Sequence, residues 1–161
     1  MAELETRQVK SEDYEWIRQR LLKNWGGDCI VSGDVMFSPQ EMEGFIAESN
    51  GERVGILSYV VISGNEMEIV LMEALNKHQG IGSALIERAK NKAFALNLTR
   101  VYLYTTNDNL DALRFYQRRD FKLVTIYTGA MIEARKMKPG IPLIGNYNIP
   151  MLDEIELEYR V

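Results

Sequence analysis

The feature that most constrains the fold of this chain is a turn with two glycines, Gly80 and Gly82, between two unlike segments. The segment before the turn, residues 66–75, is rich in residues that favour β-strands. The segment after it, residues 83–97, repeats apolar residues at helical spacing. Glycine disfavours helix interiors and suits places where the backbone bends or a ligand approaches closely. The sequence therefore predicts a strand, a tight turn and a helix in direct succession.

The rest of the chain predicts alternating strands and helices in one mixed α/β domain that covers residues 1–161. Asn50-Gly51 is a strong hairpin signal between two β-rich runs, so three strands form an antiparallel meander before the glycines. Residues 29–44 give no clear pattern. We expect strands at 6–10, 45–49, 52–62, 66–75, 99–106, 121–127 and 153–161, and helices at 11–22, 83–97, 107–119 and 129–138.

Composition and charge exclude several classes of function. The formal net charge of −4 argues against nucleic acid as the main partner. One cysteine, Cys29, and one histidine, His78, leave no basis for a disulfide or a Cys- or His-rich metal site, so we expect no metal. The first ten residues lack the apolar core of a signal peptide, and no stretch approaches the roughly 20 apolar residues of a membrane span. We expect a cytoplasmic protein that binds no membrane.

The glycine turn has the properties of a phosphate site. The start of a helix offers N–H groups without acceptors and a partial positive charge, and glycines let an anion come close to them. Residues 79–84 would supply the donors, and Lys77 a cation. The P-loop motif is absent, and Leu85 stands where the dinucleotide fingerprint needs a third glycine. A helix start with two incidental glycines is the alternative.

A second motif follows about 25 residues later. Asn109, Ala112, Phe115 and Tyr116 lie at i, i+3, i+6 and i+7, close to one face of the predicted helix. Either Asn109 or Asn107 would cap that helix. The strand before it should lie parallel to the strand before the glycines, so both helices would begin at the same edge of the sheet.

Together, the two motifs resemble those of the GCN5-related N-acetyltransferase (GNAT) family over about residues 52–127. The acyl-CoA loop of that family reads Arg/Gln-x-x-Gly-x-Gly/Ala, and residues 77–82 read Lys-His-Gln-Gly-Ile-Gly. The next family motif, Asn-x-x-Ala-x-x-Phe-Tyr-x-x-x-Gly-Phe, is matched by residues 109–121. Lys77 departs from Arg or Gln, and Asp120 replaces the glycine before Phe121. The last third also resembles an uncharacterised bacterial branch of the family.

The resemblance implies a GNAT-like fold: a central, mostly antiparallel sheet of six to seven strands with a V-shaped splay, flanked by three to four helices. It also implies acetyl-CoA as co-substrate, with its pantetheine arm along the strand before the glycines and its pyrophosphate on the turn. The cofactor-binding residues implied in this way are Val70, Leu71, Met72, Ala74, Lys77, His78, Gln79, Gly80, Ile81, Gly82, Ser83, Asn107, Asn109, Ala112, Phe115 and Tyr116.

The resemblance further implies catalytic roles. Tyr116 occupies the position of the general acid that protonates the leaving thiolate, although a buried core tyrosine is the alternative. The Met72 N–H would donate to the thioester oxygen. A base for the amine is Glu68 or Glu73, each of which is otherwise a solvated strand carboxylate. Regular pairing would place these two side chains on opposite faces of the strand, and a bulge would bring them to one face.

The implied activity is an N-acetyltransferase that moves an acetyl group from acetyl-CoA to a primary amine by direct attack in a ternary complex. A non-catalytic acyl-CoA-binding regulatory or sensor module is the alternative, which would not need Tyr116. The acceptor is a small-molecule amine or an amine of a protein or peptide, and its specificity should come from residues 25–45 and 129–150. Homodimers are a habit of the family that no residue here indicates.

Overall fold

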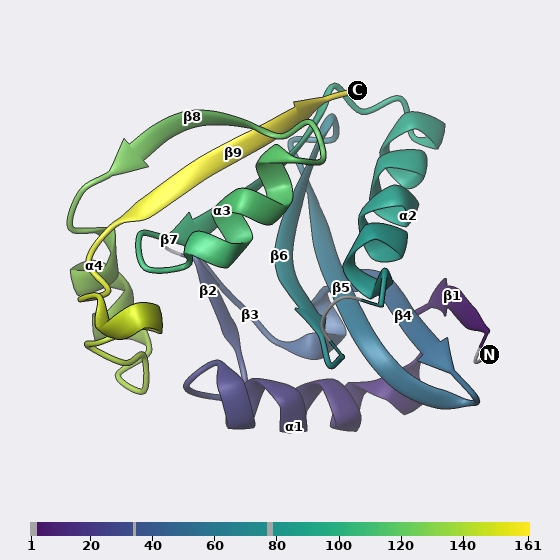
Figure 1. Cartoon of the computed structure of the whole chain (residues 1–161), viewed down its shortest axis with the longest axis horizontal. Coiled ribbons are helices and arrows are strands. Elements are labelled where there is room, and N and C mark those ends of the chain that lie inside the picture. Colours follow the sequence, from purple (N-terminus) through teal and green to yellow (C-terminus); the bar gives the residue numbers. More distant parts are fainter. Residues whose placement is uncertain (1–2, 34, 77–78) are drawn as a thin grey trace. The chain divides into compact units, whose positions relative to one another are not determined.

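The computed structural model describes residues 3–33, 35–76 and 79–161, which form two compact units (Figure 1). The first unit contains the chain up to Ile17, Gln40–Val101 and Arg160–Val161, and the second contains Arg18–Pro39 and Tyr102–Tyr159. Helix α1 (Tyr14–Asn24) runs from the first into the second. The predicted mixed α/β class, with six to seven mostly antiparallel strands and three to four helices, is confirmed in the described residues. The expectation of one domain stays a prediction.

The first unit contains an antiparallel sheet in the order β1 (Leu4–Gln8), β4 (Glu43–Ser49), β5 (Glu52–Ile62) and β6 (Glu66–Ala74). The predicted meander β4-β5-β6 is therefore confirmed. Asn50 and Gly51 join β4 to β5 with φ angles of 53° and 76°, as a two-residue hairpin turn with both central residues left-handed requires.

Helix α2 (Ile81–Ala95) packs on one face of this sheet (Figure 1). Gly55 in β5 marks the contact, because a Cβ there would collide with the side chains of Ile81 and Leu85. Apolar residues of α2 such as Ile86 and Ala89 are fully buried. Of the apolar residues at helical spacing, Leu85, Ala89 and Ala93 are buried, whereas Phe94 is 75% exposed, so the spacing identified only part of the buried face.

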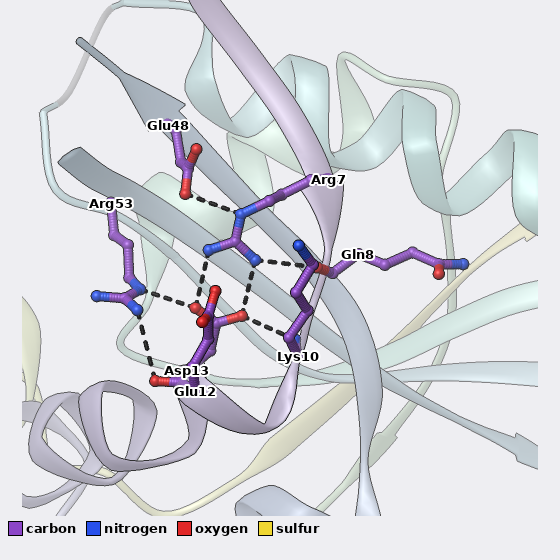
Figure 2. A network of polar contacts seen from close by, with 7 residues as sticks. All are labelled: Arg7, Gln8, Lys10, Glu12, Asp13, Glu48 and Arg53. Carbon is purple, nitrogen blue, oxygen red and sulfur yellow. Dashed lines mark hydrogen bonds and ion pairs between the residues drawn. The ribbon is translucent and has the colours of Figure 1, made fainter. Parts of the chain in front are cut away.

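The opposite face of the same sheet carries a network of charges around Asp13, whose side chain is 0% exposed. Asp13 ends the short 3-10 helix η1 (Ser11–Asp13) that leads into α1. The Arg7 guanidinium donates two hydrogen bonds to its carboxylate (2.8 and 2.9 Å), and Arg53 Nε donates a third (2.8 Å). The Lys10 N–H donates a fourth (2.8 Å), as Figure 2 shows. The network joins β1 and β5 to the chain that enters α1.

The charges of this network stabilise one another. Burial opposes ionisation of Asp13, but the hydrogen bonds from Arg7, Lys10 and Arg53 outweigh it and hold the pKa of Asp13 well below its usual range. Arg7 Nε also donates to Glu48 Oε1 (2.8 Å), which brings β4 into the network. A buried carboxylate with four donors is costly to disturb, because removing its charge leaves two guanidinium groups poorly paired.

The second unit contains three strands in the order β7 (Arg100–Thr106), β9 (Glu154–Arg160) and β8 (Lys122–Tyr127), and β8 pairs with β9 antiparallel. Helix α3 (Leu110–Gln117) follows β7, and α4 (Ala130–Met137) follows β8, as expected. The remaining short elements are the antiparallel strands β2 (Ile30–Ser32) and β3 (Val35–Phe37) and the 3-10 helices η2 (Pro39–Glu41) and η3 (Asn146–Asn148).

Asp120, which stands where the family motif has glycine, lies in the turn between α3 and β8. Its φ angle is 67°, in the left-handed region. The position therefore needs the conformation that glycine adopts at no cost, and Asp tolerates it better than most residues. The expected turn geometry is confirmed.

None of the helices in the described part of the chain is long and apolar enough to cross a membrane.

Asp13→Asn should lower the free energy of unfolding at pH 7 by about 3 kcal/mol, because two arginines lose their anionic partner. Since the pKa of Asp13 is depressed, its contribution is complete above about pH 4 and declines as the pH falls further. Urea unfolding of both proteins from pH 7 to pH 3 should show the difference between them shrink below about pH 4. Glu12→Gln, at the exposed neighbouring carboxylate, is the control, and an equal loss there would contradict this account.

Asp120→Gly should raise the free energy of unfolding by about 0.5 kcal/mol. Glycine relieves the left-handed strain of the folded state, and the greater freedom that it gives the unfolded chain offsets part of this gain. Asp120→Ala should lower the free energy of unfolding by about 1 kcal/mol, because alanine has neither the freedom of glycine nor the tolerance of aspartate for the left-handed conformation. Urea unfolding measures both changes. The same sign for both variants would show that the backbone conformation is not what this position requires.

Candidate active site

The turn before α2 has the geometry of an anion site. Gly80 is the N-cap residue with φ +76°, and among the described atoms none lies within 4 Å of the place where its Cβ would be. The described helix has no acidic residue in its first turn, so nothing there neutralises its positive end. The Ala84 N–H bonds to Gly80 O (3.0 Å), so the N–H groups of Ile81, Gly82 and Ser83 precede the first helical bond.

Several predicted cofactor residues share this end of α2. Ile81 and Gly82 are buried in the first turn, while Gln79 and Gly80 are exposed. Lys77 and His78 lie outside the described residues, so their predicted contacts with the pyrophosphate stay predictions.

The pairing of β5 with β6 decides which carboxylates share a face. Ser58 pairs with Leu71 and Tyr59 pairs with Ile69, so Val70 is an extra residue in β6, a β-bulge. The bulge reverses the alternation of side chains for the residues that follow it. The sequence left open whether β6 pairs regularly or with a bulge, and the structure has the bulge.

As a result, Glu68 and Glu73 lie on the same face of β6. Glu68 pairs with Val60 and Glu73 pairs with Ile56, and both partners point away from the face that Gly55 presents to α2. Glu68 is buried and Glu73 is half-buried. The two carboxylates therefore lie on one face of β6, although their pairing partners are four residues apart along β5, which is about 13 Å of strand.

Glu66 shares this face and forms an ion pair with Arg100. Arg100 Nε lies 3.2 Å from Glu66 Oε1, and both side chains are largely buried. This ion pair ties the start of β6 to the start of β7 within the first unit. Glu68 and Glu73 as base candidates stay a prediction.

The second group of predicted residues lies in the other unit, at α3. The Asn109 side chain accepts a hydrogen bond from the Ala112 N–H (3.2 Å), so Asn109 is the cap of this helix. Asn107 is not the cap. Its side chain binds the backbone of the loop before β9 instead, through Pro150 O, the Leu152 N–H and the Asp153 N–H (2.9–3.0 Å). Its predicted contact with the cofactor stays a prediction.

Tyr116 lies on the buried side of α3 and is only 6% exposed. Its ring meets Phe115 and Phe121 edge-on, with centroids 5.1 and 5.4 Å apart. Burial raises the pKa of the Tyr116 phenol, and the charge of Arg119 only partly opposes that. The hydroxyl is therefore neutral and able to donate a hydrogen bond across the physiological pH range. This burial fits a general acid and also a tyrosine that only packs in the core, so the role of Tyr116 as the acid stays a prediction.

Sequence reasoning missed Asp108, which precedes the cap residue Asn109. Its side chain is fully buried, and Oδ2 accepts a hydrogen bond from the Asn146 N–H (2.8 Å). Oδ1 is buried without a hydrogen-bond partner in the described structure. The only signal in the sequence was an acidic residue beside a motif position, which gives no indication of burial.

Comparison with known proteins decides the family. The model of the Acetyltransferase (GNAT) family matches residues 3–121. The chain belongs to this family. It is therefore an acyl-CoA-dependent N-acyltransferase of the GNAT type.

Similar proteins agree with this family assignment. The uncharacterised protein YxbD of Bacillus subtilis (strain 168) is 35% identical over 136 residues, 84% of this chain and 85% of that protein. The IAA acetyltransferase from Bacillus cereus ATCC 14579 has a TM-score of 0.74 at 15% identity, with 99% of this chain and 100% of the other covered. A GNAT family acetyltransferase from Elizabethkingia anophelis, solved with acetyl-CoA bound, has a TM-score of 0.73 at 18% identity, with 98% of each chain covered. The two solved structures share the fold.

The described residues of this GNAT chain contain no group of three or more His, Cys, Asp or Glu side chains that could hold a metal ion. The predicted site residues in the described part of the chain offer backbone donors, carboxylates and a phenol. These groups suit anion binding and proton transfer. The predicted splay beside β6 and the path of the pantetheine arm stay predictions.

Proposed function

We propose that the chain transfers an acetyl group from acetyl-CoA to a primary amine within a ternary complex. The observation that carries this proposal is the start of α2, where Gly80 is left-handed, the N–H groups of the first turn precede the first helical bond, and the turn has no acidic residue. This is the chemistry that a pyrophosphate group needs. The family adds that the pyrophosphate belongs to an acyl-CoA.

The residues present fit acetyl-CoA, which supplies the acetyl group as a reactive thioester. The N–H groups of Ile81, Gly82 and Ser83 would hold the pyrophosphate. The backbone of β6 from Val70 to Ala74 would pair with the pantetheine arm. The bulge at Val70 marks the start of this stretch, whose other residues pair regularly with β5. Asn109 is a further predicted contact of the cofactor.

In the transfer itself, each residue has one task. The Met72 N–H donates to the carbonyl oxygen as negative charge develops on it. The amine nitrogen attacks the carbonyl carbon, the C–S bond breaks, and Tyr116 gives its proton to the departing sulfur. Glu68 or Glu73, directly or through one water, accepts the proton that the amine loses. An acceptor that arrives as an ammonium group loses two protons: the first passes through the base to solvent before the attack, and the second, lost as the amide forms, replaces the proton that Tyr116 gave to sulfur.

The position of the two carboxylates supports a base on β6. Both lie on one face because of the bulge at Val70, so either can face an amine that binds on that side. The acceptor is an organic amine or an amine of a protein or peptide. A carboxylate-bearing face suits either, since both acceptors arrive as ammonium groups.

Tyr116→Phe should lower kcat by about 10²- to 10³-fold while the KM for acetyl-CoA changes by less than about threefold, since only the proton donor is lost. Release of CoA thiol in the presence of an amine panel measures turnover. Glu68→Gln and Glu73→Gln, assayed in the same way, identify the base by the larger loss of kcat/KM.

Tyr59→Phe is the matched control. Tyr59 is also a buried tyrosine with a raised pKa, but its hydroxyl donates to Glu43 Oε2 (3.0 Å) on the face of the sheet next to α2. This variant should keep kcat within about threefold of the wild type. Equal kcat values for Tyr116→Phe and the wild type would contradict the assigned acid. Binding of acetyl-CoA without turnover of any amine would favour a regulatory binding module.

A further inference from the structure

Strand β8 is an edge strand of the second unit. It lies beside β9 and stands last in the order β7-β9-β8, so its outer side pairs with no other strand of the described structure (Figure 1). All six residues of Lys122–Tyr127 are exposed. The outer N–H and C=O groups of β8 are therefore available to a strand of another molecule.

The composition of β8 is unusual for an edge strand. Leu123, Val124, Ile126 and Tyr127 are 44–61% exposed, and the only charged residue, Lys122, stands at the start of the strand. Edge strands are normally protected by charges along the strand, by proline or by a bulge. Of these devices, β8 has only a bulge at Val124.

The bulge gathers apolar residues on one face of β8. Ile126 pairs with Ile155 and Leu123 pairs with Leu157. The two partners are two residues apart in β9 and share a face. The extra residue Val124 therefore brings Leu123 and Ile126 to one face, although they are three residues apart.

An apolar groove continues this face toward α3. It lies between β8 and the helix residues Leu113 and Gln117, and its lining is almost wholly apolar. Leu110, one turn before Leu113, is 46% exposed. The exposed apolar surface thus extends from the strand onto α3, as at a site of protein association.

A second copy of this chain matches the edge of β8. When two β8 strands pair antiparallel about a twofold axis, Leu123 of each copy can lie opposite Ile126 of the other. Both residues belong to the face with the groove, so apolar side chains meet. In the same register, Lys122 lies opposite Tyr127 of the second copy. These two belong to the other face, where each pairs with a glutamate of β9.

The charges at the two ends of β8 fit the same arrangement. Basic residues outnumber acidic ones at the start of the strand, where the charged residues are Arg118, Arg119, Asp120, Lys122 and its pairing partner Glu158. At the other end, Asp153 and Glu154 are acidic, and Glu154 pairs with Tyr127. Antiparallel pairing brings the basic end of one copy to the acidic end of the other, whereas parallel pairing would bring like charges together.

Twofold closure also accounts for the lack of protection along β8. The strand at the other end of the sheet order, β1, carries Glu5 and Arg7, as a protected edge does. A dimer that uses β8 of both copies leaves only the charged β1 edges outside. Pairing therefore stops at two copies.

We propose that β8 is the surface through which two copies of this chain form a twofold dimer. The two strands pair antiparallel, with Leu123 of each copy opposite Ile126 of the other. The apolar groove beside α3 receives side chains of the second copy. This inference does not depend on acetyl transfer.

Sedimentation velocity of the full chain tests the interface. The wild type should be a dimer at about 10 µM. Ile126→Lys should raise the dissociation constant by at least about 100-fold, because it places an ammonium group among the apolar side chains of the interface. Leu123→Lys should act in the same way. Phe94→Lys is the matched control, since Phe94 is an exposed apolar residue of α2 in the first unit, and it should stay within about threefold of the wild type.

Three results would overturn the proposal. One is a wild type that stays monomeric up to about 100 µM, which would leave the edge to a strand of another protein. Another is a dimer that persists in both lysine variants. The third is assembly that grows beyond two copies. Circular dichroism of the lysine variants should match the wild type, because both substituted side chains are mostly exposed.

Cysteine cross-linking tests the register in a Cys29→Ser background. Leu123→Cys combined with Ile126→Cys should form a covalent dimer in oxidising buffer, because the two positions lie opposite each other across the interface. Leu123→Cys alone should not, because its two copies lie about 10 Å apart along the strands. A cross-link through Leu123→Cys alone, or none through the pair, would overturn the antiparallel register.

Discussion

One extra residue in the pairing of β5 with β6 determines which side chains of β6 share a face of the sheet. Because Val70 is bulged, Glu68 and Glu73 project from the same face of the strand, away from α2. With regular pairing, one of them would have pointed into the packing between the sheet and α2, where Gly55 leaves no room even for a Cβ. The bulge thus places both predicted base candidates on the face opposite to α2. It also re-aims the backbone of the strand at the point where a thioester would lie.

The rest of the first unit holds this strand in place. Asp13 gathers Arg7 and Arg53, and through Arg7 it also engages Glu48, so three strands of the sheet share one set of charges (Figure 2). The network lies on the same face as the two carboxylates, because Arg7 pairs with Ile46 and Ile46 pairs with Ile56. Helix α2 covers the other face and presents Gly80 at its end. The face opposite to α2 thus holds the charge network and the two carboxylates beside buried apolar residues such as Ile46 and Ile56.

Short-range signals made much of this fold predictable. Asn50-Gly51 and Gly80 specify their own backbone conformation, and the period of α2 identifies part of its buried face. The bulge was not decided by the sequence, because apolar residues continue through Val70 and only the partner strand fixes the register. The β2–β3 pair escaped prediction since each strand has three residues, too few to show a period. The left-handed Tyr147 was hidden because its residue type opposes the turn it forms.

The central claim is that the backbone of the glycine turn holds the pyrophosphate of CoA, and Gly80→Ala tests it most directly. Gly64→Ala is the matched control, because Gly64 is also left-handed, with φ +74°, and no described atom would contact its Cβ. Calorimetry should show CoA bound at least about tenfold more weakly by Gly80→Ala, and within about twofold of the wild type by Gly64→Ala, although both lose similar stability. Equal affinities of the two variants for CoA would contradict the account.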